Sequence, residues 1–375
     1  MRRVYLDHHA ATPLHPEVLV ALRALGDAGW ANPSSVHADG RASRALIERA
    51  REQVAAAIGA APADVVLTAG GTEACNLALF GAPLARGAHV LTTTVEHPAV
   101  VEPLARLEAS GELTVSRLPV LGGRVMDPAQ LMAAVTPATR LLALQWVNHE
   151  TGTIFPVAAY AHACRAAGVL TFVDATQAFG KLPLDVNALG ADLVALASHK
   201  IGGPAGAGAL WVRRGVDLRS LIVGGGQERG RRAGTADVRA AVGFGVACAL
   251  LPQRLDAQPR IAELRDRLEH ALLALGARRN AADGPRVATA TNLWFPGRRS
   301  DALVAALDLE GVAVSAGAAC SSGKSEPSPV LLAMHPEEVA KSQASLRFSF
   351  GPEVSEIDVD FVSNRCANVL ARPAA

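Results

Sequence analysis

Two charged residues, Asp174 and Lys200, each follow an apolar run. A carboxylate and an amine at such positions could carry out chemistry together. Asp174 follows the run 170–173, and Lys200 follows the run 193–197 and precedes a glycine-rich turn. Pyridoxal phosphate (PLP) needs an amine that forms a Schiff base with its aldehyde and a carboxylate that keeps its ring nitrogen protonated. The pair therefore predicts a PLP site, although an isolated lysine is more often a surface residue and an isolated aspartate a helix cap.

Polar residues after other predicted strands could complete such a site. Residues 70–73, Gly-Gly-Thr-Glu, follow the predicted strand 65–68 and open a helix, where backbone N–H groups and the helix dipole favour a phosphate. They match neither a Walker loop nor a GxGxxG fingerprint, so this signal alone is weak. His97 is either a turn residue or a ring that stacks on a flat cofactor, and Asn148 is either a turn former or a ligand contact.

Two further residues stand out near the C-terminus. Cys320 lies in a stretch of small residues, 314–324, that has almost no bulk. A structural cysteine is normally buried among large apolar side chains, so this composition indicates an exposed and reactive thiol. Arg347 stands within the apolar run 345–349, and a guanidinium there needs a carboxylate from the protein or from a substrate.

Alternating strands and helices must position these residues. Predicted strands lie at 65–68, 89–93, 113–118, 141–146, 169–173, 193–197 and 209–212, with helices between most of them. This alternation predicts an α/β fold with a mostly parallel, seven-stranded sheet flanked by helices, which binds ligands beyond the carboxyl ends of its strands. From about residue 254 the pattern is α+β. We therefore predict a large domain at 15–253 and a smaller one, formed by 1–14 and 254–375, that carries the Cys320 loop at about 315–335.

The composition is that of an ordinary soluble enzyme and argues against other classes. The chain has 375 residues, half of them apolar and 19% charged, and its net charge is +1. This charge favours neither nucleic acid nor a membrane surface as a partner, and we recognise no signal peptide or transmembrane run. The five cysteines are scattered without a CxxC pair, which argues against a disulfide framework or a metal site and for a reducing, cytoplasmic location.

A series of short motifs runs through the chain in a characteristic order. They are Tyr5-Leu6-Asp7, Asn32-Pro33-Ser34-Ser35, Gly71-Thr72-Glu73, Glu96-His97, Val147-Asn148-His149-Glu150, Val173-Asp174-Ala175-Thr176-Gln177, His199-Lys200, Arg232-Ala233-Gly234-Thr235 and Ala319-Cys320-Ser321-Ser322. Together they resemble the cysteine desulfurases, the NifS/IscS-type branch of the fold-type I PLP-dependent enzymes, which are similar to class V aminotransferases. The length of the loop after Ala319 also resembles this branch and not the SufS-type branch.

The resemblance implies a role for each matching residue. The implied cofactor-binding residues are Gly71, Thr72, His97, Asp174, Gln177, His199 and Lys200, joined by Thr235 from the neighbouring subunit of a homodimer. Lys200 would form the Schiff base and abstract the substrate α-proton, and Asp174 would pair with the ring nitrogen. Gln177 would bond the phenolic oxygen, and His97 would stack on the ring as a catalytic residue. Thr72, His199 and Thr235 would hold the phosphate.

The same resemblance implies the substrate and the reaction. Asn148 and Arg347 would bind the carboxylate of L-cysteine, and Cys320 would take its sulfur as a persulfide, leaving L-alanine. An acceptor protein would then receive the sulfur for iron–sulfur cluster assembly or tRNA thiolation. A selenocysteine lyase or an aminotransferase of the same fold is the nearest alternative, and a non-catalytic scaffold is a more distant one. The chain departs from the family pattern at Ala197, where a phosphate-binding serine is common.

Overall fold

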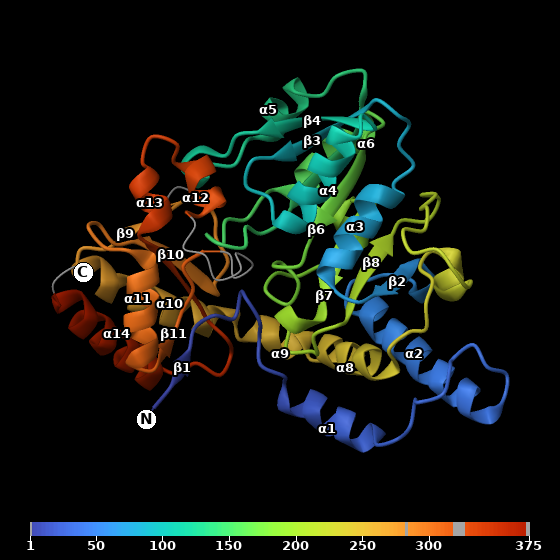
Figure 1. Ribbon diagram of the computed structural model, residues 1–375, viewed down its shortest axis with the longest axis horizontal. Helices are drawn as coiled ribbons and strands as arrows, with labels where there is room; N and C mark the ends of the chain where they lie inside the picture. Colours follow the sequence, from blue (N-terminus) through green and yellow to red (C-terminus); the bar gives the residue numbers. More distant parts are fainter. Residues whose placement is uncertain (1, 282–283, 318–326, 373–375) are drawn as a thin grey trace.

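A seven-stranded sheet forms the centre of the larger part of the molecule (Figure 1). The computed structural model describes residues 2–281, 284–317 and 327–372. The strands lie in the order β2 (Val65–Thr68), β8 (Gly208–Val212), β7 (Leu193–Ala197), β6 (Leu170–Asp174), β5 (Thr139–Gln145), β3 (Ala88–Thr93) and β4 (Leu113–Leu118). β8 pairs antiparallel with β2 and β7, and the other neighbours pair in parallel. The predicted mostly parallel, seven-stranded sheet is confirmed.

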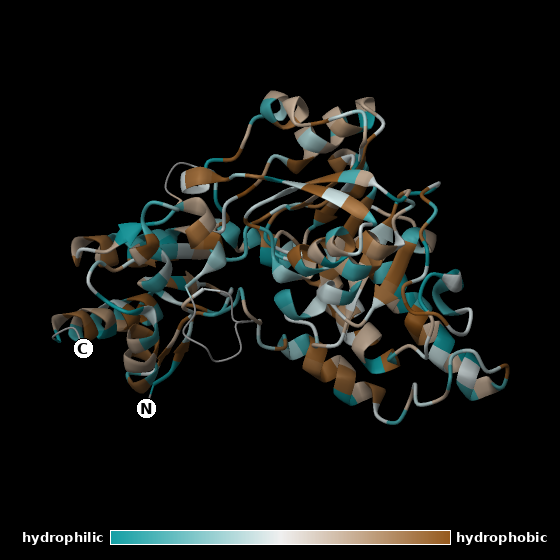
Figure 2. Cartoon of the chain, turned by 45° about the horizontal axis from the view of Figure 1, so that its top comes forward, coloured by the Kyte–Doolittle hydropathy of each residue, from teal (hydrophilic) through white to brown (hydrophobic). Residues whose placement is uncertain are grey.

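Helices cover both faces of this sheet. Along β7, Leu193 and Ala195 belong to one buried apolar cluster, and Val194 and Leu196 belong to the other, as the two-residue period of a strand requires. The first face carries α3 (Gly71–Gly81) and α4 (Pro98–Ala109), and the second carries α2 (Ala38–Ala56), α6 (Val157–Ala166) and α8 (Val238–Ala249). Figure 2 shows hydrophobic stretches along the strands and mixed colours on the surrounding helices. Burial on both faces explains why β7 and β8 read as continuous apolar runs, whereas the edge strand β4 is partly exposed and carries polar residues.

The C-terminal elements, orange and red in Figure 1, surround a small antiparallel sheet. In it β10 (Ala290–Trp294) pairs with β12 (Ser345–Ser349) and with β9 (Arg278–Arg279). The helices α10 (Gln258–Ala274), α11 (Ser300–Leu309) and α14 (Glu356–Ala371) share its apolar cluster. Strand β1 (Val4–Tyr5) lies parallel to β11 (Val312–Ala313), so the N-terminal segment packs with these elements. The division of the chain at residues 14 and 253 stays a prediction.

The segment after β1 connects the two sheets. Asp7 bridges to Ser349, and the backbone N–H of Thr12 donates to the carbonyl of His199 at 2.9 Å. The remaining helices are α1 (Pro16–Leu25), α5 (Pro128–Ala133), α7 (Val186–Leu189), α9 (Leu251–Asp256), α12 (Pro329–Met334) and α13 (Val339–Gln343). Over the described residues no single helix is long and apolar enough to cross a membrane; one bent pair, 238–249 with 251–274, passes that test by length and composition only.

Candidate active site

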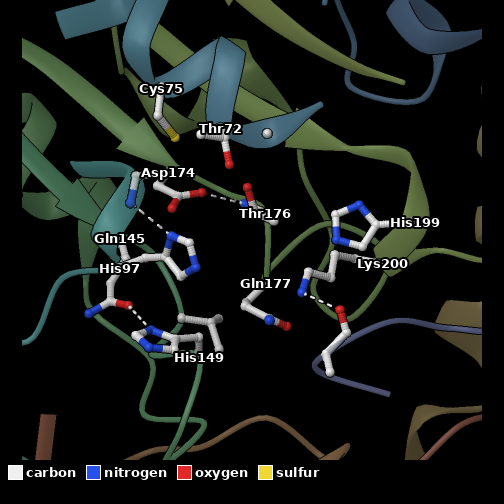
Figure 3. Close-up of a pocket in the computed structure, with 14 residues that line it drawn as sticks. Thr72, Cys75, His97, Gln145, His149, Asp174, Thr176, Gln177, His199 and Lys200 are labelled. Atoms are coloured by element: carbon white, nitrogen blue, oxygen red, sulfur yellow. Dashed lines mark hydrogen bonds between the residues drawn. The ribbon is translucent and has the colours of Figure 1, made fainter. Parts of the chain in front are cut away.

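Side chains from several strand ends converge at one edge of the large sheet. Asp174 is the last residue of β6, Lys200 ends the short turn after β7, and His97 lies between β3 and α4. Since the carboxyl ends of parallel strands share an edge, these residues meet there. They line a cavity of about 150 Å³ (Figure 3). Seven of the predicted site residues line it: Gly71, Thr72, His97, Asp174, Gln177, His199 and Lys200.

The N-terminus of α3 forms a cradle for an anion at one end of this cavity. Gly70 precedes the helix at a φ of 148° without a side-chain cap, and the first N–H groups of a helix lack intrahelical partners. A Cβ added to Gly71 would lie 3.0 Å from Thr176 Oγ1 and 3.2 Å from Ala197 Cβ, so only glycine leaves this space open. The helix dipole favours a phosphate at the same place.

Lys200 and Asp174 are held at defined positions in the cavity wall. The Nζ of Lys200 donates to the backbone carbonyls of His9 at 2.6 Å and Ala10 at 2.8 Å. Asp174 is buried, and its Oδ1 accepts from the backbone N–H of Thr176 at 2.9 Å. An amine, a buried carboxylate and an anion cradle around one cavity form the donor set that PLP requires, so the residues present fit this cofactor.

Three histidines around the cavity are neutral near pH 7. Burial, followed by the charge of Lys200, lowers the pKa of His199 to about 4. Burial also holds the pKa of His97 below its ordinary value, although the nearby Asp174 opposes this. His97 Nδ1 accepts from the backbone N–H of Ala99 at 3.0 Å, so the ring proton lies on Nε2. The His149 ring packs edge-on against His97, with 5.0 Å between ring centroids, and burial holds its pKa well below the ordinary value.

The structure does not bring every predicted site residue to the cavity wall. Within the described residues, Asn148, Arg347 and Thr235 do not line the cavity. Asn148 Oδ1 accepts from the backbone N–H groups of residues 150 and 151, and its Nδ2 donates to the Val95 carbonyl at 3.1 Å, as a turn former does. Thr235 lines a neighbouring hollow. Cys320 lies outside the described residues.

Arg347 lies behind the cavity wall. Its Nη1 donates to the carbonyl of His149 at 2.8 Å, and its Nη2 pairs with Asp7 Oδ1 at 2.7 Å. The side chain is buried, and its Nε has no hydrogen-bond partner in the part of the chain that the structure describes. Asp7 therefore supplies the carboxylate that the sequence requires for this guanidinium, and Nε is the nitrogen left without a partner among the described residues.

Some lining residues were not anticipated as site residues. They are Ala10, Cys75, Ala99, Gln145, Val147, His149 and Thr176. Gln145 ends β5, and a polar residue at the carboxyl end of a buried strand is a signal that could have identified it. Ala10 comes from the N-terminal segment, and no local sequence pattern predicts that this segment reaches the cavity.

Comparison with known proteins agrees with this geometry. The family model of the class V aminotransferases matches residues 4–362, and the chain therefore belongs to that family, whose members are PLP-dependent enzymes. Among curated relatives, a cysteine desulfurase of Cereibacter sphaeroides is 40% identical over 365 residues, covering 96% of this chain and 94% of its own.

Two solved structures extend the comparison. A NifS-like protein superposes with a TM-score of 0.89 at 30% identity, covering 98% of this chain and 99% of that one. A structure of SspA in complex with cysteine superposes with a TM-score of 0.82 at 32% identity, covering 93% of this chain and 99% of the other. The predicted fold class and family are confirmed.

Proposed function

We propose that this chain is a PLP-dependent cysteine desulfurase, which converts L-cysteine to L-alanine and takes up the sulfur as a persulfide on Cys320. The observation that carries the proposal is the meeting of Lys200, Asp174 and the α3 cradle around one cavity. The similarity to curated cysteine desulfurases over nearly the full chain supports it. Selenocysteine lyase and aminotransferase activities are the alternatives that an assay must separate.

The residues on the cavity wall account for cofactor binding. Lys200 would hold the aldehyde of PLP, and Asp174 would pair with the ring nitrogen. The N–H groups at the start of α3, with Thr72 and His199, would bind the phosphate. A neutral His199 suits this role because it can donate a hydrogen bond from one ring nitrogen while the other accepts. PLP supplies the sink for the electrons that the departing α-proton leaves behind.

The side chains of this protein then carry the proton and the sulfur. The Lys200 amine would accept the α-proton of the substrate and return it to the product. The neutral His97, with its proton on Nε2, stacks beside the reacting centre. The Cys320 thiolate attacks the substrate sulfur: the Cβ–S bond breaks, an S–S bond forms on Cys320, and the electron pair left on Cβ takes up a proton to give alanine.

Arg347, which lies behind the cavity wall in the described part of the chain, is the residue that we propose for the substrate carboxylate. The unpartnered Nε of Arg347 supports this role, because a buried donor without an acceptor is costly. Asn148 contributes by shaping the turn that carries His149. The flanks of the Cys320 loop are anchored at the same turn, since Ser328 Oγ donates to Glu150 Oε2 at 2.6 Å.

The proposal includes a homodimer in which Thr235 completes the phosphate site of the partner. Thr235 lies outside the cavity of its own chain, which is what such an exchange requires. The neighbouring Leu221, Ile222 and Val223 are exposed apolar residues and would be covered in a dimer. We further propose that the enzyme acts in the cytoplasm and delivers sulfur directly to an iron–sulfur scaffold or a tRNA-thiolation protein.

The test is an assay of the PLP-loaded protein with L-cysteine and a thiol reductant. We expect equal amounts of alanine and sulfide, no requirement for a 2-oxo acid, and loss of both products in Lys200→Ala. Cys320→Ser should keep bound PLP but form no persulfide. Turnover that depends on a 2-oxo acid would identify an aminotransferase, and activity confined to selenocysteine would identify a lyase. Either outcome contradicts the proposal.

A further inference from the structure

A buried lysine that the proposed reaction does not use, Lys181, lies directly behind the cavity wall. Its side chain is buried, with the residue 6% exposed. Its Nζ donates to the backbone carbonyl of Gln177 at 2.9 Å and to the side-chain Oε1 of Gln177 at 2.8 Å. Over the described residues, no carboxylate forms an ion pair with it. Both hydrogen bonds of the amine therefore go to Gln177, which itself lines the cavity.

The surroundings of Lys181 make this burial costly. Burial holds the pKa of its amine well below the ordinary value, and nearby positive charges add to this effect. These charges belong to Lys200, Arg254 and Arg347. A buried amine without an opposite charge destabilises a fold unless its hydrogen bonds are satisfied. A methionine of similar length would fill the same space without that cost, so packing does not explain a lysine here.

The contacts of Lys181 determine which way the Gln177 amide faces. The backbone carbonyl of His9 can only accept, so the atom 2.8 Å from it must be Nε2. The Lys181 amine donates to the other end, Oε1. Both ends of the amide are therefore assigned by their partners, which removes the usual ambiguity between oxygen and nitrogen. A flipped amide would place two acceptors, Oε1 and the His9 carbonyl, against each other.

The same contacts link Lys181 to the catalytic amine. The carbonyl of His9 accepts from Gln177 Nε2 at 2.8 Å and from Lys200 Nζ at 2.6 Å. A continuous chain of hydrogen bonds thus runs from Lys181 through Gln177 and His9 to Lys200. An amide nitrogen carries two hydrogens, and His9 takes one of those on Gln177. The second remains on a residue of the cavity wall.

We propose that Lys181 is a positioning residue that locks the Gln177 amide with its N–H toward the cavity, where it donates to the phenolic oxygen of PLP. The proposal rests on the proposed function only in assuming that PLP occupies this cavity. Lys181 touches neither cofactor nor substrate and acts through Gln177. Its removal should therefore alter the electronic state of the bound cofactor and the turnover rate, and leave substrate affinity nearly unchanged.

The experiment compares PLP-loaded variants in three measurements: the visible absorption band, the dissociation constant of PLP, and kcat and KM for alanine formation. Lys181→Met keeps the length and removes the donors, whereas Lys181→Arg keeps a donor. We expect Lys181→Met to shift the absorption band and to lower kcat by about 10- to 100-fold with KM changed by less than about threefold. Lys181→Arg should restore the band position at least in part. Lys341→Met, a lysine of α13 away from the cavity, is the matched control and should match the parent.

A double-mutant cycle with Gln177→Leu decides whether Lys181 acts through Gln177. In that background, Lys181→Met should change the band and kcat by less than about twofold. An unchanged band and kcat in Lys181→Met, or an equal loss with and without Gln177, would overturn the proposal. If Lys181→Met does not fold, Lys181→Gln enters the same cycle. A parent protein that binds PLP but makes no alanine would refute the proposed function, and the absorption band would still test Lys181.

Discussion

One buried carboxylate, Glu269, should stabilise the C-terminal part of the protein. Its contribution to the free energy of unfolding can be calculated from the shift of its pKa. Glu269 lies on α10 and is 1% exposed. It accepts hydrogen bonds from Arg279, Arg286 and Thr291. Burial alone would raise its pKa, but the hydrogen bonds from Arg286 and Thr291 and the two positive charges lower the pKa to about 2.

The magnitude follows from the difference between this value and the ordinary 4.5 of a glutamate. At about 1.4 kcal/mol per tenfold change in proton affinity, the ionised group contributes about 3 kcal/mol to the free energy of unfolding. Because the pKa is lower in the folded state, this contribution is complete above about pH 5 and is lost as the pH falls toward 2. At pH 3.5 about 1.4 kcal/mol of it has disappeared.

The free energy of unfolding of Glu269→Gln should therefore be about 3 kcal/mol lower than that of the parent at pH 7. About half of this difference should remain at pH 3.5. Urea unfolding followed by circular dichroism at the two pH values measures it. The control is Glu356→Gln on α14, whose side chain is 74% exposed in its pair with Arg267, and which should cost less than about 1 kcal/mol. A gap that is equal at both pH values would refute the electrostatic reasoning.

Three further changes test the cofactor site. Ala197→Ser places a hydroxyl toward Gly71, so the PLP dissociation constant measured by absorbance titration should fall by about fivefold, whereas Ala197→Val should raise it. Asp174→Asn removes the charge opposite the ring nitrogen, and kcat for alanine formation should fall by at least about 100-fold. Gly208→Ala would bring a Cβ within 2.6 Å of the Gly70 carbonyl carbon, so PLP binding should be lost; retained binding would contradict the close approach of β8 to the cradle.

Local patterns in the sequence were sufficient to predict the helices and strands and to identify the polar residues at their ends. The run 193–197 is buried on both faces, so it had to be apolar throughout, and β7 begins and ends where the pattern predicts. Lys200 and Asp174 could be identified because each follows such a run at the edge of the sheet where ligands bind. The family motifs then indicated the cofactor and the reaction, since their order along the chain is specific even though each is short.

Contacts between distant segments could not be predicted from those patterns. The antiparallel direction of β8, the two backbone carbonyls that hold Lys200, and the hydrogen bond from Asn148 to the Val95 carbonyl depend on how the chain returns to the same edge of the sheet. The environment of Ser198, the residue after Ala197, could not be predicted from local patterns either: its hydroxyl is buried, has no hydrogen-bond partner over the described residues and does not line the cavity.

The sequence by itself determined which residues could carry the chemistry, because residue type and position at a strand end are local properties. The tertiary structure alone decided which of them share a cavity and what holds each one in place. Lys181 illustrates the difference: in the sequence it is one lysine after a glycine, and in the fold it is a buried donor that fixes the orientation of Gln177. Orientation depends on partners far apart in the chain, such as His9, and only the folded chain brings those partners together.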